Sequence, residues 1–290
     1  MPNRKEPFCD GLDKRLIELC QTSVDVGKLQ ITPTLTKWKL LSTMLKTVVS
    51  AGFRKAELCG EFTKGSLSRQ HLTWSIAACG SQPILSPTNA QIAQLQLGDY
   101  AMLRPPVMKN DQFGERYMSF PIYLSWDSSD KCNSAVALAA LEAEFPVSAK
   151  DRINVPLFFE SCDQGTTTPF SATSLDATLR LMLTHLVGTE QASKHSWHSF
   201  RITLACSLFA AGYSEGVIQR MCRWKSVESC KAYARLDAKA YMSTLAAASR
   251  VRLQQTQTSC LIHDIPQIDA DAQWQAIDAN LPHLRRLQED

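Results

Sequence analysis

The chain has 290 residues, 44% of them hydrophobic, and its 31 basic and 28 acidic side chains give a formal charge of +3. This composition excludes a chain that is disordered throughout, because enough apolar side chains are present to form a buried core. No apolar run approaches the roughly 20 residues that a membrane-spanning helix needs. The polar N-terminus lacks the apolar stretch of a secretory signal. We therefore expect an intracellular globular protein with no membrane partner.

The charge is unevenly distributed along the chain. Residues 256–290 contain six acidic and two basic side chains, which leaves 29 basic and 22 acidic side chains, or +7, in residues 1–255. The sequence thus predicts a moderately basic body with an acidic C-terminal tail. This balance is compatible with a polyanionic partner but does not identify one.

Ten cysteines are present, but none forms a Cys-x-x-Cys pair or a Cys/His cluster at zinc spacing. Several, including Cys206 and Cys222, lie in apolar helical patterns, where cysteine behaves as a small hydrophobic residue. We expect reduced structural thiols and no metal site.

The first half of the chain mixes helical and strand patterns. A short helix is expected at 13–21, followed by a turn-rich segment. Apolar residues recur at helical spacing through 36–61, with an interruption at Gly52. Residues 71–80 resemble a strand, and 98–108 and 116–124 are two further strand-like runs around a turn that contains Asn110 and Gly114. This last pattern predicts a β-hairpin.

The remainder of the chain is predicted to be helical throughout. A helix at 174–186 has Ser174 as its expected N-cap, and a helix at 200–211 is expected to stop at Gly212. The other expected helices cover 135–144, 214–224, 227–234 and 239–253. The predicted fold class is therefore mainly α with a small antiparallel β-sheet (α+β).

One stretch carries a chemical pattern. His198-Ser-Phe-Arg201 begins a predicted helix and places both functional side chains on one face. Trp224 follows Arg201 by 23 residues, and Tyr233 follows Trp224 by nine. This arrangement resembles the C-terminal signature of the tyrosine recombinases, the phage integrase family: His-x-x-Arg, then His or Trp, then a nucleophilic Tyr.

Two further residues of that family have counterparts here. The segment Gly52-Phe-Arg54-Lys-Ala-Glu57-Leu58 fits the motif of the family's first arginine, and Lys109 begins the predicted hairpin turn where the family has its lysine. Lys131 is a poorer alternative for that lysine. The resemblance covers about residues 36–250 and implies the tyrosine recombinase catalytic-domain fold. Its local sequence is more similar to eukaryotic transposon-type recombinases than to bacterial chromosome resolvases.

The sequence departs from the family at two places. Family members precede the catalytic domain with a helical clamp domain, whereas only 53 residues precede Arg54. We accordingly expect three parts: a short N-terminal segment at 1–35 in which the clamp is reduced or missing, a catalytic domain at 36–255, and an acidic tail at 256–290. In addition, Arg223 occupies the place before Trp224 where the family usually has glycine.

The resemblance implies a role for each of the six residues. Arg54 and Arg201 would clamp the scissile phosphate, and Tyr233 would attack it to form a 3′-phosphotyrosine, which requires neither a metal nor ATP. His198 would assist the phenol, Lys109 would protonate the departing 5′-oxygen, and Trp224 would offer its indole N–H to a phosphate oxygen. Taken singly, each residue has an ordinary structural explanation as a salt-bridge, turn or core residue. The joint pattern favours catalysis.

The function expected from the resemblance is site-specific DNA strand cleavage and rejoining, that is, DNA recombination or integration by a transposable element. The partners would be double-stranded DNA and three further copies of the chain in a tetramer, without a cofactor, in the nucleus if the source is eukaryotic. Two alternatives remain: a non-catalytic or domesticated DNA-binding descendant and, less favoured, a type IB topoisomerase. The helix at 240–253 would either dock on a neighbouring subunit or pack on its own domain.

Overall fold

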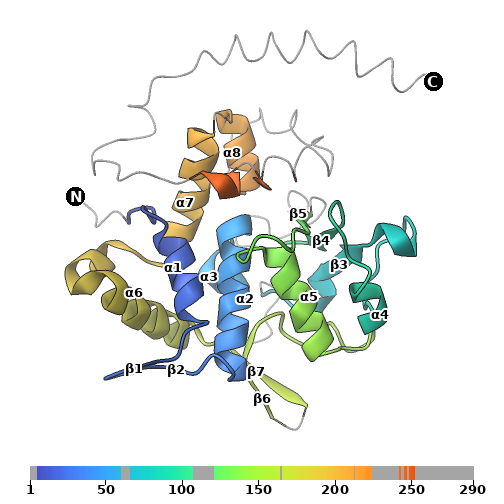
Figure 1. The fold of residues 1–290 in the computed structure, drawn as a ribbon, viewed down its shortest axis with the longest axis horizontal. Coiled ribbons are helices and arrows are strands. Elements are labelled where there is room, and N and C mark those ends of the chain that lie inside the picture. Colours follow the sequence, from blue (N-terminus) through green and yellow to red (C-terminus); the bar gives the residue numbers. More distant parts are fainter. Residues whose placement is uncertain are drawn as a thin grey trace.

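The computed structural model describes residues 5–59, 66–106, 121–163, 165–211 and 213–223, together with residues 242, 245, 246 and 248–251 (Figure 1). Within these ranges the chain combines α-helices with three small antiparallel sheets, which agrees with the predicted α+β class.

Helix α2 (Thr36–Ala51) runs through the middle of the molecule (Figure 1). It contacts α1 (Leu12–Leu19), α5 (Ser134–Glu144) and α7 (Trp197–Ala210). Side chains around most of its circumference are buried, from Trp38 to Val48, as expected for a helix with neighbours on several sides. The position of its C-terminal end therefore depends on the packing of much of the domain.

The N-terminal segment shares this core. Phe8, Leu12 and Leu16 are almost completely buried in the same hydrophobic cluster as α2. Helix α1 confirms the predicted first helix, and the backbone N–H of Phe8 donates to Thr203 Oγ1 of α7 at 2.7 Å. After α1, strands β1 (Val24–Val26) and β2 (Leu29–Ile31) form a small hairpin around Gly27, where the sequence predicts only turns.

The two strands of the predicted hairpin are paired as expected. Strands β4 (Tyr100–Leu103) and β5 (Ile122–Ser125) pair antiparallel, with Leu103 opposite Ile122. Strand β3 (Leu72–Ser75) pairs with the other edge of β4, which completes a three-stranded sheet. The short helices around this sheet are η1 (Arg69–His71), η2 (Ala77–Cys79) and α4 (Asn89–Ile92).

The prediction that the chain is helical throughout after this sheet is wrong at one place. Strands β6 (Phe159–Asp163) and β7 (Thr166–Pro169) form a hairpin that contacts α2. The strands suit this sequence because β-branched threonines fill β7, and Gly165 adopts a positive φ of 82° in the turn.

Helix α6 (Ala172–Lys194) begins earlier than predicted, and Gly188, with a non-helical φ of 81°, interrupts it close to the predicted end at 186. Its N-cap is Ser171 rather than Ser174, since the Ser171 side chain accepts a hydrogen bond from the Ser174 N–H at 2.9 Å. Helix α7 likewise begins three residues before the predicted start. Helix α8 (Glu215–Met221) follows it, with Ser214 as N-cap.

Part of the predicted last helix packs on its own domain. Leu245 and Ala248 are buried, and Lys14 Nζ of α1 donates to the carbonyl oxygen of Ser249 at 3.4 Å. A cavity of about 560 Å³ between α1, α2 and α7 is also lined by Leu245, Ala246, Ala248, Ser249 and Val251. The sequence allows this segment either to dock on a neighbouring subunit or to pack on its own domain. Its described residues make the second of these contacts.

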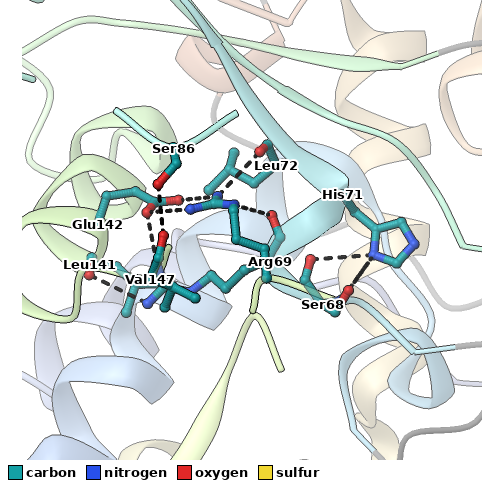
Figure 2. A network of polar contacts seen from close by, with 9 residues as sticks. Ser68, Arg69, His71, Leu72, Ser86, Leu141, Glu142 and Val147 are labelled. Atoms are coloured by element: carbon teal, nitrogen blue, oxygen red, sulfur yellow. Dashed lines mark hydrogen bonds and ion pairs between the residues drawn. The ribbon is translucent and has the colours of Figure 1, made fainter. Parts of the chain in front are cut away.

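A buried ionic network joins the start of the three-stranded sheet, next to β3, to helix α5 (Figure 2). Glu142 Oε2 lies 3.1 Å from Arg69 Nη1, and Glu142 Oε1 accepts from Arg152 Nη2 at 2.6 Å. All three side chains are at most 2% exposed. Arg152 Nε also donates to the Arg69 carbonyl oxygen, so the network ties two loops to one helix.

Replacing Glu142 by Gln should destabilise the protein by about 3–5 kcal/mol, because it leaves two buried guanidinium groups without their shared carboxylate. Urea denaturation measures this change in the free energy of unfolding. The control is Glu144→Gln, which removes an ion pair with Lys39 whose two side chains are 42% and 45% exposed and should cost about 1 kcal/mol or less. Equal effects of the two substitutions would contradict a structural role for the network.

Candidate active site

The site begins at the C-terminal end of α2. Gly52 caps this helix in the left-handed conformation, with φ +57°, and its N–H donates to the Val48 carbonyl oxygen at 2.8 Å. The chain then reverses through Phe53 and enters the short helix α3 (Lys55–Leu58), for which Arg54 is the N-cap. This turn places Arg54 beside the end of α2, with 35% of its side chain exposed.

A second feature favours glycine at position 52. A Cβ atom there would lie 3.0 Å from Leu204 Cδ2 and 3.6 Å from Arg201 Cγ, both on α7. The absence of a side chain lets the backbone of the turn lie directly against α7. The Gly-x-Arg motif and the His-x-x-Arg motif are therefore in contact in the folded chain.

Arg201 lies at this contact and is only 2% exposed. Its Nη1 donates to the Gly52 carbonyl oxygen at 3.2 Å, across 149 residues of sequence. Its Nη2 is buried and has no hydrogen-bond partner within the described part of the chain. Burial, followed by the positive charges of Arg223 and Arg54, lowers the pKa of Arg201 to about 10. The guanidinium therefore remains charged at neutral pH and retains a donor for an anion.

His198 lies one helical turn before Arg201, at the start of α7. This end of the helix is fixed by a hydrogen bond from the Ser196 N–H to Ser199 Oγ at 3.1 Å and by another from Trp197 Nε1 to the Leu175 carbonyl oxygen at 3.2 Å. His198 itself is exposed. Partial removal from water, followed by the positive charges of Arg201 and Arg54, lowers its pKa below the ordinary value of 6.5. Its imidazole is thus neutral near pH 7 and able to accept a proton.

Glu57 connects Arg54 to a third arginine, Arg223. Glu57 Oε2 accepts from the Arg54 N–H at 2.8 Å and from Arg223 Nη2 at 3.0 Å, while Oε1 lies 3.5 Å from Arg54 Nη1. Arg223 Nη1 also donates to the Ala51 carbonyl oxygen at 2.9 Å. Arg223 is not among the six site residues that the sequence predicts. The one available signal was its occurrence where the resembled family usually has glycine.

Charge in this cluster is unbalanced. Three guanidinium groups, those of Arg54, Arg201 and Arg223, share the single carboxylate of Glu57 among the residues that the structure describes. Carbonyl oxygens at the C-terminal end of α2 compensate part of the excess, because the negative end of the helix dipole lies there. Counted over the described residues alone, the three guanidinium groups and one carboxylate leave an excess of positive charge, which a bound anion would offset.

The cluster differs in one respect from the network around Glu142. Arg69 and Arg152 are wholly enclosed, whereas Arg54 and His198 are accessible from solvent. An anion can therefore approach the cluster at the end of α2 but not the enclosed network. This distinction makes the former the candidate site.

The structure brings together three of the six predicted site residues: Arg54, His198 and Arg201. Lys109, Trp224 and Tyr233 lie outside the described residues. Lys109 belongs to the connection between β4 and β5, whose antiparallel pairing is the hairpin that the sequence predicts around it. Lys131, the alternative, comes after β5 and is exposed.

Comparison with known proteins adds no assignment. No protein-family model matches the chain, and no curated protein or solved structure proved significantly similar to it. Among the described residues, no group of three or more His, Cys, Asp or Glu side chains is arranged to hold a metal ion. In the same residues, no helix is both long and apolar enough to cross a bilayer. Their eight cysteines are all free thiols.

The electrostatic coupling of His198 to the arginines can be tested by titration. Replacing Arg54 by Gln removes a neighbouring positive charge, so protonation becomes easier and the pKa of His198 should rise toward 6.5. The imidazole resonance followed by NMR across pH 4–9 reports this value. Lys55→Gln is the control, because Lys55 pairs with Asp176. A pKa that does not move in Arg54→Gln, or moves equally in the control, would show that the two side chains are not coupled.

Proposed function

We propose that this protein is the catalytic domain of a tyrosine recombinase, which cleaves and rejoins DNA strands through a 3′-phosphotyrosyl intermediate. The observation that supports this most strongly is the contact between the Arg54 turn and the His198–Arg201 helix. These two segments are about 150 residues apart in sequence, yet Arg201 is hydrogen-bonded to the turn two residues before Arg54. A random similarity of sequence motifs would not require that contact.

The two arginines suit a phosphodiester substrate. When a nucleophile attacks phosphorus, negative charge grows on the two nonbridging oxygens. Arg201, which is buried and has a donor without a partner, and Arg54, which is partly exposed, would each donate hydrogen bonds to those oxygens. Guanidinium groups held in place before the reaction stabilise the developing charge without a metal or a nucleotide cofactor.

The proposed reaction balances with the chain's own groups. The Tyr233 oxygen forms a bond to phosphorus, the bond from phosphorus to the 5′-oxygen breaks, and the DNA 3′-phosphate stays on the tyrosine. The phenolic proton passes to the imidazole of His198, whose lowered pKa leaves the ring unprotonated and able to accept a proton near pH 7. Lys109 would give a proton to the departing 5′-oxygen, and Trp224 would donate to a phosphate oxygen. Attack by a new 5′-hydroxyl reverses these steps and reseals the strand.

The proposed partners are double-stranded DNA and, by resemblance, three other copies of the chain. A non-catalytic DNA-binding descendant is the main alternative. It would keep the same cation cluster but would form no covalent bond. Trapping of the intermediate separates the two hypotheses.

The trapping experiment uses a pool of duplexes with a randomised core and a nick in one strand. Cleavage near the nick releases a short fragment, so resealing is prevented and the protein stays linked to DNA. In EDTA and without nucleotide, the wild-type chain should form adducts that resist SDS, and Tyr233→Phe should form none, because only the attacking hydroxyl is lost. Its affinity for the pool should change by less than about twofold.

Tyr241→Phe provides the control, since Tyr241 is the nearest other tyrosine in the sequence. It should form adducts as the wild type does, and peptide mapping should place the DNA on Tyr233. Adducts that persist in Tyr233→Phe would refute the assignment of the nucleophile. A wild-type chain that binds the pool without forming adducts would favour the non-catalytic alternative.

A further inference from the structure

Arg223 is held in an unusual backbone conformation. It follows the C-terminal end of α8 with φ +50°, a left-handed value that residues other than glycine rarely adopt. The conformation turns the side chain back toward α2, where its guanidinium stacks on the Phe53 ring at 4.4 Å. Only 4% of the side chain is exposed.

The contacts of Arg223 are with protein groups. Nη1 donates to the Ala51 carbonyl oxygen, and Nη2 donates to the Gly52 carbonyl oxygen at 3.4 Å and to Glu57 Oε2 at 3.0 Å. Both terminal nitrogens therefore have acceptors beneath the Arg54 turn. Its Nε is buried and has no hydrogen-bond partner among the described residues. With both terminal nitrogens engaged by protein acceptors, the side chain would act on an anion mainly through its neighbours.

The neighbour that matters is Glu57. Its carboxylate contacts two guanidinium groups, and the contact with Arg223 Nη2, at 3.0 Å, is closer than the one with Arg54 Nη1, at 3.5 Å. Without Arg223, the charge of Glu57 would be compensated mainly by Arg54. The Arg54 side chain would then be drawn toward Glu57, and its positive charge would be less effective toward a phosphate group.

We infer that Arg223 is a positioning residue that neutralises Glu57 and so preserves the positive charge of Arg54 for phosphate. The inference rests on the proposed function for the identity of the physiological ligand. The electrostatic argument about Arg223, Glu57 and Arg54 does not depend on that function. It also explains why an arginine stands before Trp224: Arg223 controls how much of the positive charge of Arg54 is available to a ligand. The end of α8 is thereby coupled through a buried ion pair to α3, the short helix that begins directly after Arg54.

The test is a double-mutant cycle with inorganic phosphate as the probe, at constant ionic strength, followed by the NMR resonance of His198. Arg223→Met removes the charge but keeps a long apolar side chain that can cover Phe53. It should weaken phosphate binding about tenfold, the order expected for loss of one charge–charge interaction in a partly buried site. Arg223→Lys keeps the charge and should weaken binding less.

Glu57→Gln supplies the second side of the cycle. In the Arg223→Met background it should restore phosphate affinity to within about twofold of the Glu57→Gln variant, because no carboxylate then remains to compete for Arg54. A role limited to packing would not be rescued in this way. The double variant also removes both buried charges together, so it should fold even if Arg223→Met alone does not.

Three results would overturn the inference: unchanged phosphate affinity in Arg223→Met, a double variant that binds phosphate about tenfold more weakly than Glu57→Gln, or a wild-type chain that binds no phosphate near His198. None of these depends on DNA cleavage. If the phosphate measurements give the expected results but no DNA adduct forms, the positioning role of Arg223 is supported and the proposed function is contradicted.

Discussion

The left-handed turn at Gly52 is the constraint on which the candidate site depends. Its carbonyl oxygen accepts hydrogen bonds from both Arg201 and Arg223, which come from the two helices at the C-terminal end of the described chain. Because α2 is packed on several sides, the position of this turn is fixed by the core and not by the site itself. The arginines are thus anchored to a helix whose side chains are mostly buried in the core. A side chain at position 52 would strain the left-handed turn and press on Leu204 and on the stem of Arg201, next to the groups of the site.

Among the described residues, arginines outnumber carboxylates in the cluster around Glu142 and in the cluster around Glu57. The two clusters differ in how accessible their arginines are to solvent. Around Glu142 the arginines are enclosed and donate to backbone carbonyl oxygens, so their charge serves to join a helix to two loops. Around Glu57 a similar buried arginine–carboxylate cluster lies next to the solvent-accessible side chains of Arg54 and His198. Burial, followed by the positive charges of the neighbouring arginines, lowers the pKa values of both Arg201 and His198. An anionic ligand would relieve this repulsion, which is why the cluster is suited to a phosphate group.

The sequence predicted the elements whose side-chain periodicity is strong and missed those that depend on distant contacts. Helices α1, α2 and α5 and the pairing of β4 with β5 were expected because their apolar patterns and breakpoints are local. The β6–β7 hairpin was not predicted, although the threonines around Gly165 are a strand signal. Arg54, His198 and Arg201 could be selected by motif spacing. The role of Arg223 could not, because its partner Glu57 is 166 residues away and its backbone conformation is not encoded by any neighbouring glycine.

The presence of a phosphate site at the end of α2 can be tested by locating an oxyanion in crystals of the protein. Tungstate is a suitable probe, because it resembles phosphate in shape and charge and its anomalous scattering identifies it without ambiguity. We expect one strong peak whose oxygens lie about 3 Å from the guanidinium nitrogens of Arg54 and Arg201 and near the His198 imidazole. The peak should be lost in Arg201→Ala and retained in the control variant Lys55→Gln. Tungstate bound only at other places on the surface, with this cluster occupied by the protein's own side chains, would contradict a phosphate site formed by these three residues.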